Sequence, residues 1–236
     1  MSHRRVTIRH AAKGPSKTAI AAAEGRTLYT STRKVPDAPN PAGLLALRMS
    51  SNEKLGKRIT KGWAKGMPLV TLTLEERATC PDACAHWLDC YGNNMRFADR
   101  IMHGPALEAA LEADVARLAA KYPAGFMVRL HVLGDFYSLA YVALWARLMA
   151  RHPALHVYGY TARTEGPMGA ALAALGETCG RRWMVRQSGH AGTMGAVRLA
   201  LHPSAVPCPE QTGKAPSCGA CGFCWTGSKA VGFLDH

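Results

Sequence analysis

FMVRLHVLGDFYSLAYVALWARLMARHPALHVYGYTA (residues 126–162) predicts a strand, a helix and a second strand in succession. The strands are expected at 126–135 and 155–162, where β-branched and aromatic residues are frequent. Ser138 is suited to cap the helix between them, and apolar residues recur after it every three or four positions. Two strands joined by a helix normally lie parallel in one sheet, with a right-handed crossover.

The same alternation continues on both sides of this unit. Helices are predicted at 106–121 and 166–175, and strands at 69–74, 182–188 and 196–201. Strands that alternate with helices of this length indicate a largely parallel sheet. We therefore expect an α/β fold, either a partial (β/α) barrel or an open parallel sheet, with a cysteine-rich C-terminal cluster segment.

Composition divides the 236 residues into three predicted parts. Residues 1–45 carry linker signals such as PDAPNP and are expected to form a basic, weakly ordered arm. Residues 46–204 form the α/β core with a first cysteine group. Residues 205–236 form a C-terminal segment with a second cysteine group.

Polar side chains share one face of the three central strands. The residues that would contact an anionic or polar ligand there are Arg129, His131, Tyr160 and Arg186. Buried parallel strands are normally apolar on both faces, so a polar face predicts a hydrated cavity. The alternative is an antiparallel sheet with one face in solvent.

Gly134 and Asp135 follow the first of these strands, at the carboxyl end where α/β folds bind ligands. Asp135 is a candidate to accept a hydrogen bond from an ammonium group or ribose hydroxyl of a cofactor. The alternative is that Asp135 serves only as a turn residue or cap.

The first cysteine group is a C-x3-C-x5-C run formed by Cys80, Cys84 and Cys90. Pro81 suits the start of a helix after Cys80. Three thiolates can hold one 4Fe–4S cluster and leave one iron open to another ligand. Zinc, with His86 or a distant residue as fourth ligand, and no metal at all are the alternatives.

The second cysteine group contains CGACGFC, which has the C-x2-C-x2-C spacing of bacterial ferredoxins. Its predicted ligands are Cys208, Cys218, Cys221 and Cys224. Zinc sites normally use two separated C-x2-C pairs, so the spacing favours a second 4Fe–4S cluster.

Positive charge is concentrated ahead of the first cysteine. Residues 1–66 hold 14 Lys and Arg against 3 Asp and Glu, whereas the remaining residues hold 15 against 13. This asymmetry predicts a basic arm that binds nucleic acid, and a solvated arm without a partner is the alternative. No signal peptide or membrane-spanning run is visible, so we expect a cytoplasmic protein without a membrane partner.

The segments TCPDACAHWLDCYG, HVLGDFYS, CGACGFCW and VGFLDH resemble the phage "gene product 88" family. This resemblance covers about residues 51–236 and implies a phage-encoded protein of the host cell cytoplasm. More distantly, the first cysteine group resembles the cluster loop of radical S-adenosylmethionine proteins, which have a partial (β/α) barrel. That resemblance implies S-adenosylmethionine at the open iron and an auxiliary cluster on the C-terminal cysteines. The chain departs from the pattern by having five residues, not two, between Cys84 and Cys90.

Three functional hypotheses follow. The first is a phage-type iron–sulfur enzyme, radical S-adenosylmethionine-like, that acts on nucleic acid or a nucleotide. The second is a non-enzymatic, zinc-dependent nucleic-acid-binding module. The third is an iron–sulfur protein with a redox or host-interaction role.

Overall fold

The computed structural model describes residues 32–84, 86–87, 90–95 and 97–234. Its main element is an eight-stranded sheet in the order β2-β3-β5-β6-β7-β8-β10-β9. The strands are β2 Arg48–Met49, β3 Leu69–Thr71, β5 Phe126–Leu130, β6 Leu155–Thr161, β7 Trp183–Ser188, β8 Gly195–Arg198, β9 Val206–Pro207 and β10 Val231–Phe233. Neighbouring strands are parallel except for β2 and β3, which pair antiparallel. A separate two-stranded parallel sheet joins β1 Thr32–Arg33 to β4 Arg100–Ile101.

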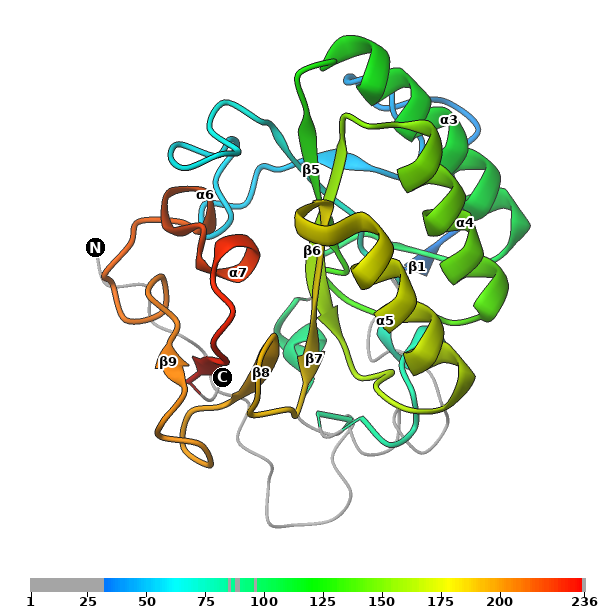
Figure 1. The fold of residues 1–236 in the computed structure, drawn as a ribbon. Helices are drawn as coiled ribbons and strands as arrows, with labels where there is room; N and C mark the ends of the chain where they lie inside the picture. The colour runs from blue at the N-terminus through cyan, green and yellow to red at the C-terminus, as the bar shows by residue number, and fades with distance from the viewer. Residues whose placement is uncertain (1–31, 85, 88–89, 96, 235–236) are drawn as a thin grey trace.

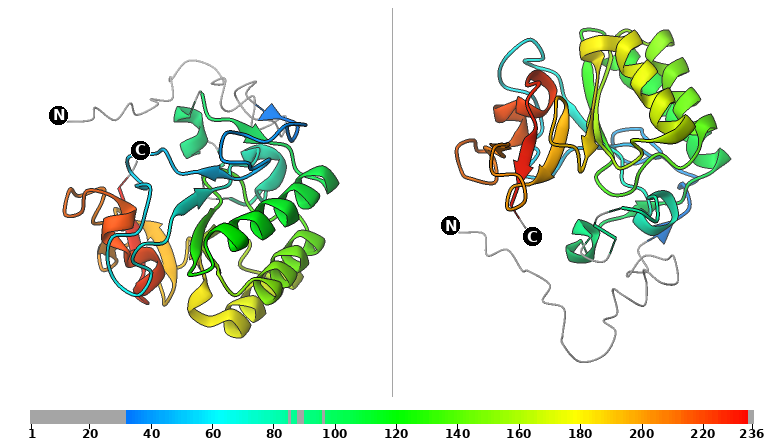
Figure 2. Two further views of the ribbon diagram at one scale, coloured as in Figure 1. Left: turned by 90° about the horizontal axis from the view of Figure 1, so that it is seen from above. Right: turned by 60° about the horizontal axis from the view of Figure 1, so that its bottom comes forward.

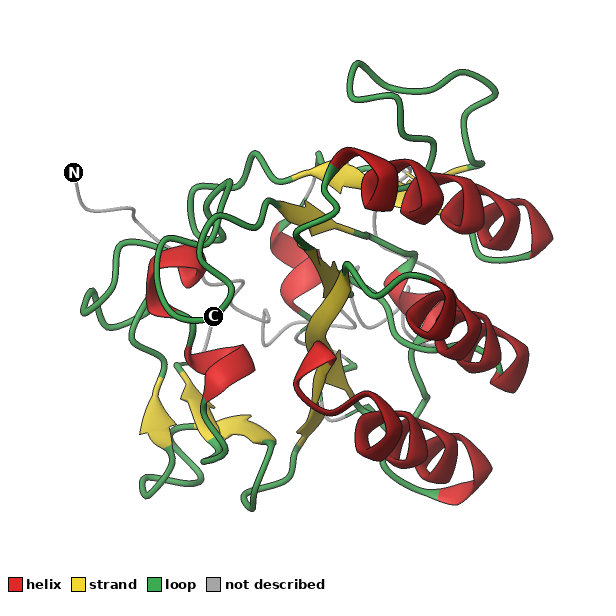
Figure 3. Ribbon diagram, turned by 45° about the horizontal axis from the view of Figure 1, so that its top comes forward, coloured by secondary structure: helices red, strands yellow, loops and turns green. Residues whose placement is uncertain are grey.

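Three long helices cover one face of the large sheet (Figure 1, Figure 3). They are α3 Pro105–Lys121, α4 Leu139–Arg151 and α5 Gly166–Cys179. The short helices are α2 Glu76–Thr79, α6 Cys218–Cys221 and α7 Phe223–Thr226, with 3-10 turns η1 Tyr91–Asn94 and η2 Gly180–Arg182. From β5 to β7 the strand order follows the chain, so the right-handed crossovers α4 and α5 fall on the same side. The short helices α6 and α7 lie on the opposite face of the sheet (Figure 2).

The main core lies between the sheet and the long helices. Its strand residues include Val128, Leu130 and Val157, and α4 contributes Trp145, which is 0% exposed. Ser138 Oγ accepts a hydrogen bond from the Tyr141 amide at 3.1 Å, so the predicted helix cap is confirmed.

A smaller core occupies the amino-end half of the opposite face. There Met127, Tyr158 and Leu69 pack against Trp225 of α7. The rings of Tyr158 and Trp225 meet edge to face, with centroids 4.8 Å apart. This face is therefore packed near the amino ends of the strands, and the polar residues lie further along.

The sheet is open, because β2 and β9 stand at its two edges. The expected α/β class with a largely parallel sheet is confirmed, and no closed barrel forms among the described residues. Residues 205–236 contribute β9 and β10 to this same sheet. Most of the predicted arm, residues 1–31, lies outside the described part of the chain. None of the described helices has the length and apolar character needed to cross a membrane.

Candidate functional site

A cavity of about 350 Å³ lies where the C-terminal segment covers the polar half of the sheet. Six cysteines line it, three from each predicted group: Cys80, Cys84, Cys90, Cys208, Cys218 and Cys224. The two groups are far apart in the sequence, and the fold brings both to one space. Cys221, at the end of α6, is half-buried and is not part of this lining.

The first cysteine group follows α2. The predicted helix after Cys80 does not form among the described residues, where 82–83 make a turn. Cys80 itself follows the end of α2 and is extended, with φ −73° and ψ 152°. Pro81 explains this, since the residue before a proline is pushed out of the helical region. Cys84 then closes a turn by donating its amide to the Pro81 carbonyl at 2.9 Å. Burial raises the pKa of the Cys80 thiol well above its ordinary value, and Asp135, Cys90 and Cys84 raise it further.

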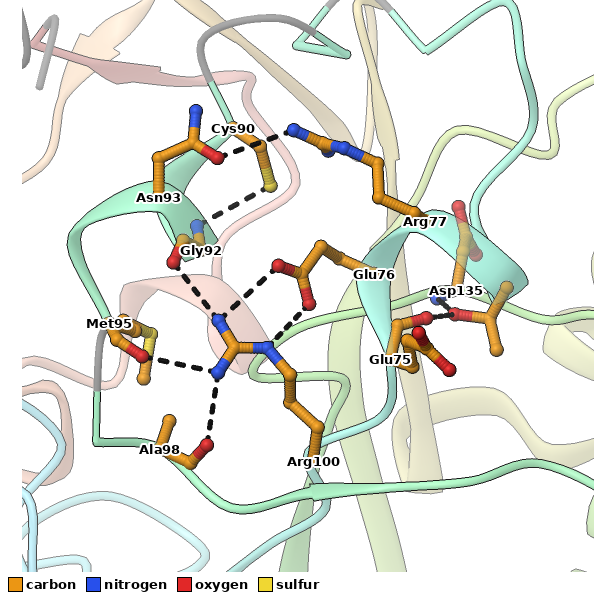
Figure 4. Close-up of polar contacts among 11 residues, drawn as sticks. Glu75, Glu76, Arg77, Cys90, Gly92, Asn93, Met95, Ala98, Arg100 and Asp135 are labelled. Carbon is orange, nitrogen blue, oxygen red and sulfur yellow. Dashed lines mark hydrogen bonds and ion pairs between the residues drawn. The ribbon is translucent and has the colours of Figure 1, made fainter. Parts of the chain in front are cut away.

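A buried ion pair fixes the chain that follows Cys90 (Figure 4). Arg100 Nε donates to Glu76 Oε2 at 2.7 Å, and the two side chains are 0% and 1% exposed. The same guanidinium donates to three carbonyls, those of Gly92, Met95 and Ala98. Because Glu76 belongs to α2, this network joins the approach to Cys80 with the loop after Cys90.

Cys90 also receives a hydrogen bond from the backbone. Its Sγ accepts from the Gly92 amide at 3.4 Å. Burial raises the pKa of this thiol, whereas the neighbouring Arg77 lowers it by favouring the thiolate. Backbone N–H groups directed at cysteine sulfur are a common feature of iron–sulfur ligation.

Gly134 and Asp135 pack against Thr79, the residue that precedes Cys80. The Asp135 amide donates to Thr79 Oγ1 at 3.1 Å. A Cβ on Gly134 would lie 2.6 Å from the same oxygen, so the close approach requires glycine. The Asp135 carboxylate accepts from Thr161 Oγ1 and the Ala162 amide, both at 2.7 Å, and it is 4% exposed.

Both carboxylate oxygens of Asp135 are thus engaged by groups of the chain itself. A third donor, the Phe136 amide, lies 2.8 Å from Oδ1. Burial raises the pKa of this carboxyl, and these hydrogen bonds partly offset the rise. The arrangement favours the interpretation of Asp135 as a turn residue that joins two strand ends over the interpretation as a cofactor ligand.

The second cysteine group lies on α6, α7 and the end of β9. Ser217 caps α6 by accepting from the Ala220 amide at 3.2 Å. A Cβ on Gly219 would lie 2.3 Å from the Arg58 carbonyl, so α6 packs directly on the segment 52–60. Burial, with smaller contributions from Cys224 and Cys208, raises the pKa of Cys218 to about 12.

The four polar strand residues that were predicted to contact a ligand do not all line the cavity. Arg129 and Tyr160 line the cavity, with the guanidinium 4.6 Å from the Tyr160 ring centroid. Tyr160 OH lies 2.8 Å from Cys224 Sγ. His131 borders the cavity, but β5 ends at Leu130, and its ring packs near Phe136 and Tyr141.

Arg186 does not line the cavity. It is 0% exposed and donates to backbone carbonyls of the C-terminal segment, including Cys224 at 3.0 Å and Lys229 at 2.9 Å. In this structure its side chain supports the segment that carries the second cysteine group. Buried guanidinium groups require several acceptors, which these carbonyls provide.

Sequence reasoning did not identify several residues of the lining. Asn52, Lys54 and Leu55 reach the cavity from the segment that packs on α6. Arg198 Nη2 lies 3.0 Å from His86 Nδ1, and this contact connects β8 to the first cysteine loop. No local sequence pattern signals these contacts, because they depend on long-range packing.

The donor set fits iron–sulfur ligation in its chemistry. All eight cysteines are free thiols, and Tyr158 OH is a buried group of the cavity wall without a hydrogen-bond partner. No three His, Cys, Asp or Glu side chains among the described residues are close enough to hold one metal ion. A tetrahedral zinc ion, with Zn–S bonds of about 2.3 Å, needs its sulfurs about 4 Å apart. Among the described residues the thiols therefore form no ready site for a single zinc ion.

Comparison with known proteins gives one family match. The family model described as gene product 88 matches residues 45–172, which is more than half of the chain. This range includes the first cysteine group, β3, β5, β6 and the helices α3 and α4. No curated protein and no solved structure gives a significant match.

Proposed function

The chain belongs to the gene product 88 family, and we propose that it is a phage-type iron–sulfur protein with two clusters at one cavity. Cys80, Cys84 and Cys90 would hold the first 4Fe–4S cluster. The second would be held by the C-terminal cysteines, of which Cys208, Cys218 and Cys224 line the cavity. The family match supports the phage assignment, and the cluster assignment rests on the cysteine arrangement.

The convergence of the two cysteine groups is the observation that carries this proposal. Six thiols from two distant segments face one space of about 350 Å³. Five of these six thiols are only partly buried, so packing as small apolar side chains does not account for so many at one cavity. Ligation of inorganic iron explains both their number and their convergence.

Within this two-cluster proposal, we further propose that the protein is an enzyme similar to radical S-adenosylmethionine proteins. A cluster held by three cysteines leaves one iron open, and when bound it would supply an electron to a cofactor at that position. Arg129 faces this cavity and is suited to bind a carboxylate. A nucleotide or nucleic acid substrate is part of this proposal, because the sequence is strongly basic before residue 67.

Two alternatives have different metal contents. A zinc-dependent binding module would require the thiols of each group to move closer together. An iron–sulfur protein with a redox or host-interaction role would use the same cysteines without binding S-adenosylmethionine.

Anaerobic purification followed by iron, sulfide and zinc analysis tests the proposal. We expect brown protein with about eight irons and eight sulfides per chain, as two cubane clusters require. The triple variants C80A/C84A/C90A and C208A/C218A/C224A should each retain about four irons. Cys179→Ala is the matched control, because Cys179 lies at the end of α5 away from the cavity.

Three outcomes distinguish the alternatives. Colourless protein with about two zinc ions would support the binding module and contradict the cluster proposal. Loss of all iron in either triple variant would show one shared cluster. Wild-type protein that carries both clusters but does not cleave S-adenosylmethionine in dithionite would contradict only the finer enzymatic proposal.

A further inference from the structure

The loop between Ile59 and Met67 is firmly attached to the fold. The Ile59 amide donates to the Met67 carbonyl at 3.0 Å, and the Gly66 amide donates back to Ile59 at 2.8 Å. Arg58 Nη1 donates to the Gly66 carbonyl at 2.8 Å. Ile59 and Ala64, each 1% exposed, anchor the loop in the smaller core. The loop therefore presents its other side chains in a fixed arrangement.

This loop is strongly cationic. The exposed basic residues of this loop and of the two positions before it are Lys57, Arg58, Lys61 and Lys65. No Asp or Glu occurs from residue 54 to residue 74. Among the described residues, no acidic side chain forms an ion pair with Lys57, Lys61 or Lys65. Their charge is therefore available to an anionic partner.

An exposed tryptophan lies among these charges. Trp63 is 36% exposed, whereas Trp145, Trp183 and Trp225 are at most 4% exposed. Its ring centroid is 5.2 Å from that of His156, and the Arg181 guanidinium lies 5.4 Å from it. These contacts hold the indole in place while part of it remains accessible. An ordered aromatic ring surrounded by lysines is the usual composition of a stacking platform for unpaired bases.

We propose that residues 57–66, together with Arg181, form a binding surface for single-stranded nucleic acid. Trp63 would stack on a base while the lysines contact phosphates. Duplex DNA or RNA fits less well, because its bases are already stacked on each other. An anionic membrane also fits less well, because the two neighbours of Trp63 are a glycine and a buried alanine, which offer no apolar surface for insertion.

This surface is separate from the predicted N-terminal arm, and it does not depend on cluster binding. It is nevertheless connected to the cavity through β6. His156, Tyr158 and Tyr160 alternate along one face of that strand, and four residues of strand span about 13 Å. A polynucleotide bound at Trp63 would thus lie near the amino-end side of the cavity.

Oligonucleotide titration of the full chain tests the proposal. We expect a 20-nucleotide oligo(dT) or oligo(rU) to bind and to quench tryptophan fluorescence. Trp63→Leu should weaken binding about 5-fold to 100-fold and remove most of the quenching, because stacking is lost. K61E/K65E should reduce the slope of log K against log salt by about 1.4, which is the contribution of two phosphate contacts. K121E/R151E is the matched control, since it changes the charge equally at exposed ends of α3 and α4.

The variants change only side chains on the surface, so a change in oligonucleotide binding reports on this surface and not on folding. Far-UV circular dichroism and iron content should be unchanged in all of them, so failure here is distinct from failure of the cluster proposal. The proposal would be overturned if Trp63→Leu bound oligonucleotide like the wild type, or if K121E/R151E reduced the slope as much as K61E/K65E. Binding of phosphatidylserine vesicles, without binding of oligonucleotide, would identify a membrane surface instead.

Discussion

Thr79, the residue before the first cysteine, is held by three separate parts of the chain. Its hydroxyl donates to the Glu75 carbonyl at 2.7 Å and accepts from the Asp135 amide at 3.1 Å. Arg163 Nη2 donates to its carbonyl at 3.0 Å. The position of Cys80 is therefore set by the ends of β5 and β6 rather than by the cysteine loop alone.

Gly134→Ala should destabilise the protein by about 1–3 kcal/mol, as measured by urea unfolding. Gly134 has a φ of +87°, and an added Cβ would lie 2.6 Å from both Leu74 Cβ and Thr79 Oγ1. Gly189→Ala is the matched control, because Gly189 has a φ of +81° but nothing within 4 Å of the added Cβ. Equal losses in the two variants would show that backbone strain alone, and not packing on Thr79, makes glycine necessary.

At the scale of elements, local patterns predicted the three long helices well and the short elements poorly. The helix expected at 106–121 is α3, which begins one residue earlier, because its apolar stripe and Pro123 are local signals. The strand expected at 126–135 ends at Leu130. The strands β9 and β10 were not predicted, since they have two and three residues and are defined by their pairing with each other and with β8.

Arg186→Lys should loosen the C-terminal segment more than it destabilises the whole protein. Arg186 donates to the carbonyls of Phe223, Cys224 and Gly227, and lysine cannot reproduce this planar set of donors. We expect local stability to fall by about 2–4 kcal/mol, because buried carbonyls lose their partners. Hydrogen exchange of the amides in 223–231 measures this loss.

Arg182→Lys is the corresponding control, at the last residue of η2, just before β7. Its guanidinium is only partly buried and donates to the Met149 carbonyl at 2.9 Å, far from the C-terminal segment. Unchanged exchange in 223–231 for Arg186→Lys would contradict the supporting role assigned to Arg186.

At the scale of the whole molecule, the sequence singled out candidate residues but did not show how the fold brings them together. The two cysteine groups and the polar strand residues were recognisable from spacing and alternation. Their assembly around one cavity was not, because it depends on β10 inserting between β8 and β9 and so returning the second group to the sheet. That pairing connects Val231 with Ala196 and Val206, contacts that no local pattern encodes.

Removal of the proposed clusters by a chelator under reducing conditions should leave the protein folded. The main core contains no cavity cysteine, and β8, β9 and β10 pair through their backbones. We expect far-UV circular dichroism to be retained and urea unfolding to stay cooperative, with a lower midpoint. Loss of most secondary structure would contradict this expectation and would indicate metal-dependent folding, as in zinc fingers.

The position of β10 between β8 and β9 has a consequence for biosynthesis. During translation β5, β6, β7 and β8 can add to the growing sheet one after another, in the order in which they leave the ribosome. Strand β9 cannot pair until β10 has been synthesised, because β10 is its partner and the second cysteine group lies between the two strands. The thiols of this group therefore take up their places at the cavity only after β10 has emerged and paired between β8 and β9.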